Sequence, residues 1–160
     1  MSATANSANL ELPAFINGEA VRSGETLEVH NPWDSSVVGT VPMLGAAHLE
    51  QAVNAAYGGG TPLTKYQRHE VLTRASVLLG ERTEEYVELL SREAGLCVFE
   101  TRYEVGRSQD VLRFAAMESL KDDGEIFSCD ISPNGPQRKI FTVREPLPLI
   151  AAITPFNHPL

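Results

Sequence analysis

The chain has 160 residues, of which 42% are hydrophobic and 21% are charged, and its formal net charge at pH 7 is −8. This composition predicts one globular domain with a sizeable core, and the acidic balance argues against nucleic acid and anionic membranes as partners. The two cysteines, Cys97 and Cys129, stand at no metal-ligand spacing, and no apolar run is long enough for a membrane span. A reduced, cytoplasmic compartment is therefore favoured over a disulfide framework, and no metal site is expected.

The first part of the chain is predicted to be a polar tail followed by short strands. Residues 1–12 have neither the basic start nor the apolar core of a signal peptide, and we expect a flexible tail there. Asn17-Gly18 stands between the β-prone runs 14–16 and 19–22, which is the strongest local signal for a two-residue hairpin turn. Further short strands are predicted over residues 26–30 and 37–41.

Apolar residues at helical spacing predict four helices in the next part of the chain. The run Gly58–Gly60 is interpreted as the end of the first helix, because no G-x-G-x-x-G phosphate loop follows a strand there. Thr83 is expected to cap the third helix and Gly95 to end it. The pair His69-Glu70 is not a zinc motif, because the second His that such a motif requires four residues later is missing.

The fourth helix, predicted over about 98–121, carries large side chains on two sides. An apolar stripe consists of Val98, Val105, Leu112, Ala116 and Leu120. A mixed stripe nearly opposite consists of Tyr103, Arg107, Asp110 and Phe114. We expect both sides to be covered, and a covered guanidinium at Arg107 then needs an anion. Two readings stay open: a salt bridge to Glu104 or Asp110, or contact with an anionic substrate.

The last part of the chain is predicted to contain a hairpin and then a buried strand. Residues 124–132 and 137–145 are interpreted as two strands joined by a proline-rich turn. The apolar run 149–153 is too short for a helix and ends near a proline-flanked polar pair, Asn157-His158, as a buried parallel strand does at a functional loop. Ligands bind at the carboxyl ends of strands in open α/β sheets, so this pair is a candidate site. An ordinary proline turn is the alternative.

Several of these segments together resemble the aldehyde dehydrogenase family. Residues 153–160 read ITPFNHPL and follow REPL at 144–147, which is similar to the family's R-x-P-L-G-V strand and P-W/F-N-x-P turn. Residues 15–19, FINGE, and 30–32, HNP, resemble the family's opening hairpin and the N-P segment that follows it. One departure is Pro148, where the family usually has Gly.

The resemblance implies an α/β fold that is the N-terminal, incomplete portion of the aldehyde dehydrogenase fold. Residues 13–123 would be the N-terminal part of the NAD(P)-binding domain, and residues 124–145 would be an oligomerisation arm that reaches another subunit. Residues 146–160 would supply the first strand and the oxyanion-hole turn of the cofactor-binding sheet. A homo-oligomer, dimer or tetramer, is expected for the full-length protein.

The resemblance also implies a reaction, the oxidation of an aldehyde to a carboxylate through a cysteine thioester, with the hydride passed to NAD or NADP. Asn157 would donate its amide N–H to the oxyanion of the intermediate. A structural Asn in a proline-rich turn is the alternative role. Residues lining the ribose and phosphates of the cofactor would be Ile153, Thr154, Pro155 and Phe156.

The family's nucleophilic Cys and its Glu general base lie downstream of the Asn-x-Pro turn, and neither is present in this chain. Cys97 and Cys129 do not match the context of the nucleophile. We therefore expect the N-terminal part of a longer enzyme, inactive by itself. The alternative is a non-catalytic oligomerisation or binding module.

His158 bears on the substrate. Together with Arg107 it could form a cationic pocket for an anionic aldehyde. This pairing resembles the phosphonoacetaldehyde dehydrogenase branch, whose turn reads Asn-His-Pro and whose fourth helix carries such an Arg. A His that packs within the turn, in a dehydrogenase of neutral semialdehydes, is the alternative.

Overall fold

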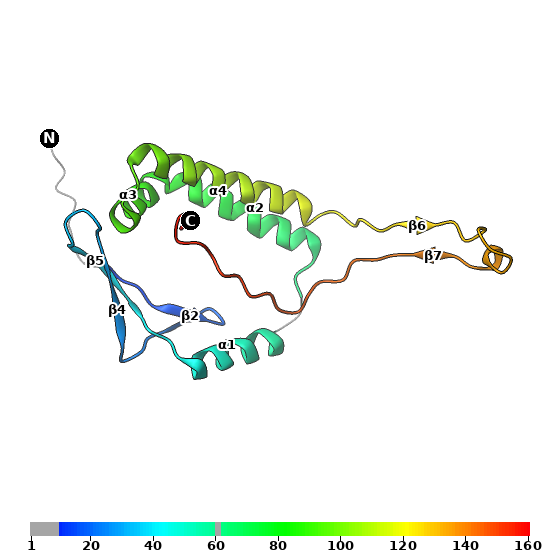
Figure 1. The fold of residues 1–160 in the computed structure, drawn as a ribbon, viewed down its shortest axis with the longest axis horizontal. Coiled ribbons are helices and arrows are strands. Elements are labelled where there is room, and N and C mark those ends of the chain that lie inside the picture. The colour runs from blue at the N-terminus through cyan, green and yellow to red at the C-terminus, as the bar shows by residue number, and fades with distance from the viewer. Residues whose placement is uncertain (1–9, 60–61) are drawn as a thin grey trace.

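The computed structural model describes residues 10–59 and 62–160 and has a β layer, a helical layer and a projecting arm (Figure 1). The strands are β1 (Leu10–Glu11), β2 (Ala14–Ile16), β3 (Glu19–Val21), β4 (Thr26–His30), β5 (Val37–Pro42), β6 (Ile126–Phe127) and β7 (Ile140–Phe141). The helices are α1 (Ala46–Gly58), α2 (Lys65–Glu81), α3 (Thr83–Ala94) and α4 (Val98–Glu118), with a 3-10 turn at Gly135–Gln137. The mixed α/β composition and the four helices agree with the predicted fold class.

The β layer confirms the predicted hairpin and corrects the predicted tail. β2 and β3 pair antiparallel around Asn17 (φ 53°) and Gly18 (φ 80°), the two positive φ angles that this tight turn requires. β5 is the central strand of a three-stranded sheet, antiparallel to β4 and parallel to β1. Leu10 and Glu11 therefore belong to a strand, and only residues 1–9 of the predicted tail lie outside the described residues.

The helix ends follow local sequence signals, with one exception. α1 ends at Gly58 as predicted, although Gly60 lies outside the described residues. Gly95 ends α3 in the left-handed region at φ 68°. Thr83 is not the cap of α3: it is the first helical residue, and its hydroxyl donates to the Gly80 carbonyl at 2.8 Å. The Thr83 hydroxyl therefore provides a hydrogen bond to a carbonyl at the end of α2, and it does not accept one from an amide at the start of α3.

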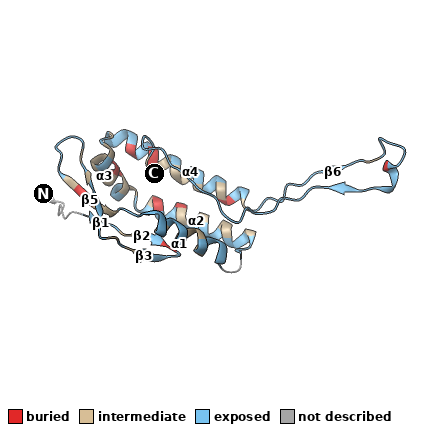
Figure 2. Cartoon of the chain, turned by 60° about the horizontal axis from the view of Figure 1, so that its bottom comes forward, coloured by how far each residue is buried: buried red, intermediate tan, exposed pale blue. Residues whose placement is uncertain are grey.

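The core lies where α2 and α3 pack on α4, as the buried positions in Figure 2 show. Its buried members are Leu79, Val87, Leu90 and Val105, with Tyr86 and Leu112 packed against them. Within the predicted apolar stripe of α4, Val105 and Ala116 are buried, whereas Val98 and Leu120 are exposed. The mixed stripe is also exposed, so the prediction that α4 is covered on two sides is wrong for the described chain. The cause is that α2 and α3 both pack on the same side of α4.

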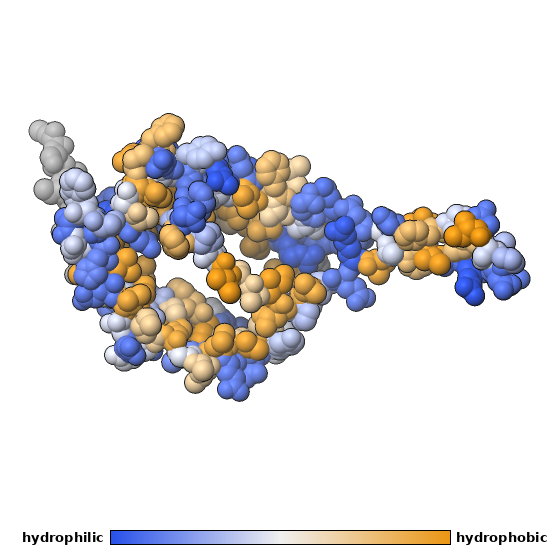
Figure 3. All heavy atoms as spheres, viewed as in Figure 1, coloured by the Kyte–Doolittle hydropathy of each residue, from blue (hydrophilic) through white to orange (hydrophobic). Residues whose placement is uncertain are grey.

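The C-terminal third leaves the helical layer, forms the arm and then returns toward it (Figure 1). β6 and β7 pair antiparallel, Ile126 with Phe141 and Phe127 with Ile140, so the predicted hairpin forms with much shorter strands than 124–132 and 137–145. The predicted strand over 149–153 is absent, because no segment of the described chain pairs with it. Figure 3 shows hydrophobic side chains around an opening in the molecule. The most exposed large hydrophobic residues of the segment 147–160 are Leu147, Ile150, Ile153 and Phe156.

Candidate functional site

A cleft of about 360 Å³ lies between α4 and the turn at residues 155–160. Its walls are formed by Leu96, Glu100, Tyr103, Glu104, Arg107, Asn157 and His158. The four residues from α4 follow one another at i, i+3, i+4 and i+7, which places them on one face of a helix. The cleft therefore brings together three of the predicted site residues, Arg107, Asn157 and His158, from segments far apart in the sequence.

Glu104 is the buried one of the charged residues that line this cleft, with only 9% of its side chain exposed. Its Oε1 atom accepts a hydrogen bond from the Leu160 backbone N–H at 2.9 Å. Its Oε2 atom lies 3.5 Å from Nδ1 of His158. One turn further along α4, the Ser108 hydroxyl donates to the Leu160 carbonyl at 3.3 Å. The turn that carries Asn157 and His158 is thus attached to α4 through the Glu104 carboxylate.

Arg107 is exposed, and the prediction that it is covered is wrong. Its guanidinium lies 6.0 Å from the centre of the Tyr103 ring, a weak cation–π contact at an exposed site. The two carboxylates considered as its partners are engaged elsewhere: Glu104 with the turn, and Asp110 with Arg113 at 3.1 Å. Arg107 forms no ion pair with any residue of 10–59 or 62–160, so the salt-bridge reading does not hold.

The turn itself is open to solvent. Asn157 and His158 are both exposed, and both line the cleft. Ile153, Thr154, Pro155 and Phe156 precede them and are also exposed, but they lie outside the cleft. Within the described chain, no backbone group of these four residues takes part in a hydrogen bond. Their backbone donors and acceptors are therefore available to a bound molecule.

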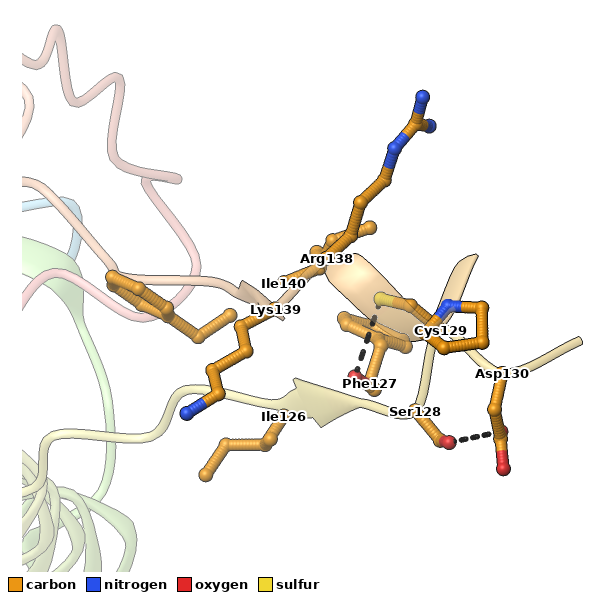
Figure 4. A pocket seen from close by; sticks show the side chains of 10 residues that line it. Ile126, Phe127, Ser128, Cys129, Asp130, Arg138, Lys139 and Ile140 are labelled. Atoms are coloured by element: carbon orange, nitrogen blue, oxygen red, sulfur yellow. Dashed lines mark hydrogen bonds between the residues drawn. The ribbon is translucent and has the colours of Figure 1, made fainter. Parts of the chain in front are cut away.

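Neither cysteine lines the cleft. Cys97 is the exposed residue that precedes α4. Cys129 lies in the arm, where a pocket of about 520 Å³ opens between the β6 and β7 segments (Figure 4). Its thiol lies 3.7 Å from the Phe127 carbonyl, and the neighbouring Ser128 hydroxyl donates a hydrogen bond to the Asp130 carboxylate.

Within the described ranges, no three potential metal ligands lie close enough together to hold a metal ion. Among residues 10–59 and 62–160, none of the helices combines the length and the apolar character that a membrane span requires.

Sequence reasoning treated Glu104 only as a partner for Arg107 and missed its contact with the turn. One signal was available: Glu104 lies between Thr101 and Val105 on the core side and one helical turn before Arg107 on the cleft side. A carboxylate at such a boundary position is expected to find a local donor when it is buried. The donor itself, Leu160 N–H, is 56 residues away in sequence, and no local pattern points to it.

Comparison with known proteins adds to this geometry. Residues 20–160 match the model of the aldehyde dehydrogenase family. The 3-sulfolactaldehyde dehydrogenase of Pseudomonas putida is 35% identical over 155 residues, which cover 94% of this chain and 31% of that protein. Among solved structures, aldehyde dehydrogenase 21 from Physcomitrella patens, in complex with the reaction product succinate, aligns with a TM-score of 0.75 and 27% identity over 80% of this chain and 27% of that one.

A second solved structure is the NADP-dependent glyceraldehyde-3-phosphate dehydrogenase from Bacillus halodurans complexed with NADP. It aligns with a TM-score of 0.72 and 27% identity, over 79% of this chain and 28% of that chain. The chain belongs to the aldehyde dehydrogenase family. It spans about 31% of the length of the curated relatives that it matches.

Proposed function

We propose that this chain acts as the N-terminal part of an NAD(P)-dependent aldehyde dehydrogenase that oxidises an anionic aldehyde to a carboxylate. Residues 13–123 would form the N-terminal part of the NAD(P)-binding domain, 124–145 the arm that contacts a second subunit, and 146–160 the turn that faces the reacting carbonyl. Family membership supports the reaction class. The observation that carries the anionic substrate is the exposed guanidinium of Arg107, without a carboxylate partner in the described chain, beside Asn157 and His158.

Asn157 is proposed to donate its side-chain N–H to the developing oxyanion. A neutral amide donates a hydrogen bond without titrating, and preorganised donors of this type stabilise the charge that forms in acyl transfer. Its exposure at the cleft supports this role, because a donor sealed inside the protein could not reach a substrate. The nucleophile and the general base would come from other parts of the enzyme, since Cys97 and Cys129 both lie outside the cleft.

NAD or NADP would supply the hydride acceptor, and residues 153–156 fit the edge of such a cofactor. Their backbone groups are exposed and unpaired within the described chain, as contacts to ribose and phosphate oxygens require. Pro155 contributes no N–H and fixes the backbone before the turn. The proposed contacts are therefore mainly those of the main chain, at Ile153, Thr154 and Phe156.

Arg107 and His158 are proposed to bind the anionic group of the aldehyde. The Nδ1 atom of His158 faces Glu104, while its Nε2 atom has no ion-pair or hydrogen-bond partner in the described residues. The similar proteins support an anion by their names: one acts on 3-sulfolactaldehyde, one holds succinate as its product, and one acts on glyceraldehyde 3-phosphate. A phosphonate, as in phosphonoacetaldehyde, is the finer proposal.

The test uses the full-length protein read from the coding DNA, with succinic semialdehyde and phosphonoacetaldehyde as anionic substrates and butyraldehyde as a neutral one. Arg107→Ala is expected to raise KM for the anionic aldehydes about 10- to 100-fold, the value of a hydrogen bond to a charged group, with little change for butyraldehyde. Arg113→Ala is the matched control, because this arginine is on the same helix, pairs with Asp110 and does not line the cleft. Equal losses on all three aldehydes would assign Arg107 a structural role.

One observation favours a second candidate function, a non-catalytic oligomerisation module. The arm exposes Ile126, Ile131 and Phe141, and such strand edges pair readily with partners. A stop codon directly after Leu160, with no NAD(P)H formed from any of the three aldehydes, would favour the module over the enzyme.

A further inference from the structure

Glu104 stands apart from the other charged residues of the described chain, because it is the one that is buried. The buried polar residues are Ser76, Thr101 and Glu104, and Glu104 is 7% exposed. Burying a carboxylate costs free energy unless donors replace the water that it loses. The donor here is the Leu160 N–H at 2.9 Å, and Nδ1 of His158 lies 3.5 Å from the other carboxylate oxygen, both in the turn. The turn therefore both covers the carboxylate and satisfies it.

The attachment of this turn depends on very few contacts. Between residues 143–160 and the rest of the described chain, the polar contacts are Glu104 with Leu160, Glu104 with His158, and Ser108 with Leu160. The apolar side chains of the returning segment contribute little, since Ile153 is 98% exposed and Phe156 is 93% exposed. Two of the three polar contacts involve Glu104.

We propose that Glu104 is a positioning residue that holds the 155–160 turn on α4 and thereby fixes the Asn157 amide at the cleft. Asn157 is adjacent to His158 and three residues before Leu160, so the two anchored positions lie on the same side of it. Pro155 and Pro159 flank the pair and restrict its backbone further. Anchoring at residues 158 and 160 leaves the amide of Asn157 few positions other than one facing the cleft.

The structural part of this proposal is independent of the enzymatic function, whereas its catalytic consequence rests on the proposed function. A donor to an oxyanion acts only when it is held within a fraction of an ångström of its productive place. Releasing the turn should therefore weaken transition-state stabilisation more than substrate binding. Arg107 lies on α4 itself and keeps its position when the turn is released.

The structural test compares three variants of the 160-residue chain by amide hydrogen exchange of the turn, measured by NMR. Glu104→Ala removes both contacts and is expected to speed exchange of the Leu160 amide about tenfold or more. Glu104→Gln keeps an acceptor oxygen for that amide and is expected to stay within about threefold of the wild type. Glu100→Ala is the matched control, because Glu100 lines the same cleft one turn earlier without bonding the turn, and it should leave the rate unchanged.

Loss of folding in Glu104→Ala would be seen as loss of helical circular dichroism. In that case Glu104→Met replaces it, since methionine is close to glutamate in length and provides no carboxylate acceptor. It should also speed exchange of the Leu160 amide about tenfold or more, because the acceptor of that amide is lost. An unchanged rate in whichever of the two variants folds overturns the proposal.

The kinetic test uses the full-length protein with the anionic and neutral aldehydes. Glu104→Ala should lower kcat about tenfold or more for both with little change in KM, and Glu104→Gln should recover most of the loss. Arg107→Ala gives the opposite pattern, a KM effect restricted to anions. If the wild type oxidises no aldehyde, the proposed function fails, and the exchange rates still decide whether Glu104 holds the turn. A Glu104→Ala variant with a normal kcat would contradict the claim that Glu104 contributes to catalysis by positioning Asn157.

Discussion

The helical body, α2 to α4, and the segment after it, residues 119–160, are organised in opposite ways. The body contains most of the buried side chains, including Leu79, Val87, Leu90 and Val105. The later segment contains a single buried residue, Gly135 at the tip of the arm. The cleft forms where one region meets the other, with Arg107 on the packed helix and Asn157 on the loosely attached turn.

This difference shows that the two sides of the cleft are held in place differently, one by packing of α4 and the other by a few polar contacts of the turn. Burial of apolar surface stabilises the body at about 25 cal/mol per Å², so the face of α4 has a defined position before any ligand binds. The turn has almost no buried surface, and its place depends on polar contacts to Glu104 and Ser108. Such a segment belongs to the low-stability end of a protein.

The largest expected effect contrasts the same truncation in the two regions. Leu90 is 4% exposed in the core, whereas Leu147 is 73% exposed in the returning segment. Leu90→Ala should reduce the free energy of unfolding by about 2–5 kcal/mol, because it removes buried methyl groups and leaves a cavity. Leu147→Ala should change it by less than about 0.5 kcal/mol. Urea denaturation followed by helical circular dichroism measures both, and similar losses would show that the later segment packs as tightly as the body.

The next effect uses Gly→Ala exchanges. Gly106 is inside α4, and a Cβ atom there meets nothing within 4 Å, so Gly106→Ala should stabilise the helices by about 0.5–1 kcal/mol. At Gly135 a Cβ atom would overlap the Cys129 carbonyl oxygen. Gly135→Ala should therefore distort the arm, seen as NMR shift changes over residues 126–141, without changing the unfolding midpoint of the helices. A lower midpoint would mean that arm and body unfold together.

The smallest effect concerns a surface pair within the body. Arg102 on α4 forms two hydrogen bonds with the Glu84 carboxylate at the start of α3, and these bonds lower the pKa of Glu84 from its ordinary 4.5. A lowered carboxyl pKa stabilises the fold above pH 4.5, and this stabilisation is lost as the pH falls through the pKa of the folded state. At neutral pH the wild type should have a larger free energy of unfolding than Glu84→Gln, and this difference should disappear in acid.

The control for this pair is Glu50→Gln on α1, outside the helical body. Glu50 pairs with no cation in the described part of the chain, so Glu50→Gln should change the free energy of unfolding little at neutral pH. Added salt should also narrow the gap for Glu84→Gln, because both partners are exposed and screening is effective there. A gap that widened in acid would contradict the sign of the pKa shift.

Local signals in the sequence determined much of the fold. The two-residue turn requires positive φ angles, which Asn17 and Gly18 adopt more readily than other residues, and Gly95 ends α3 because a glycine enters the left-handed region at little cost. The apolar spacing on α4 located Val105 and Ala116 in the core. The turn and the helix end depend on contacts within a few residues, which a sequence pattern records, whereas the spacing on α4 indicates only which face is apolar. The resemblance to the family was also recognised from the sequence, because several short motifs occur in the order that is typical of aldehyde dehydrogenases.

Only the tertiary structure decided how the candidate site is assembled. It engaged the Glu104 carboxylate, one of the two partners considered for Arg107, with the Leu160 N–H from 56 residues away. The other partner, Asp110, pairs with Arg113 within the same helix. The tertiary structure also left residues 149–153 without a strand partner, although their pattern is that of a buried strand. Pairing and burial depend on groups distant in sequence, and the free energy of such contacts is set by geometry that no local pattern contains.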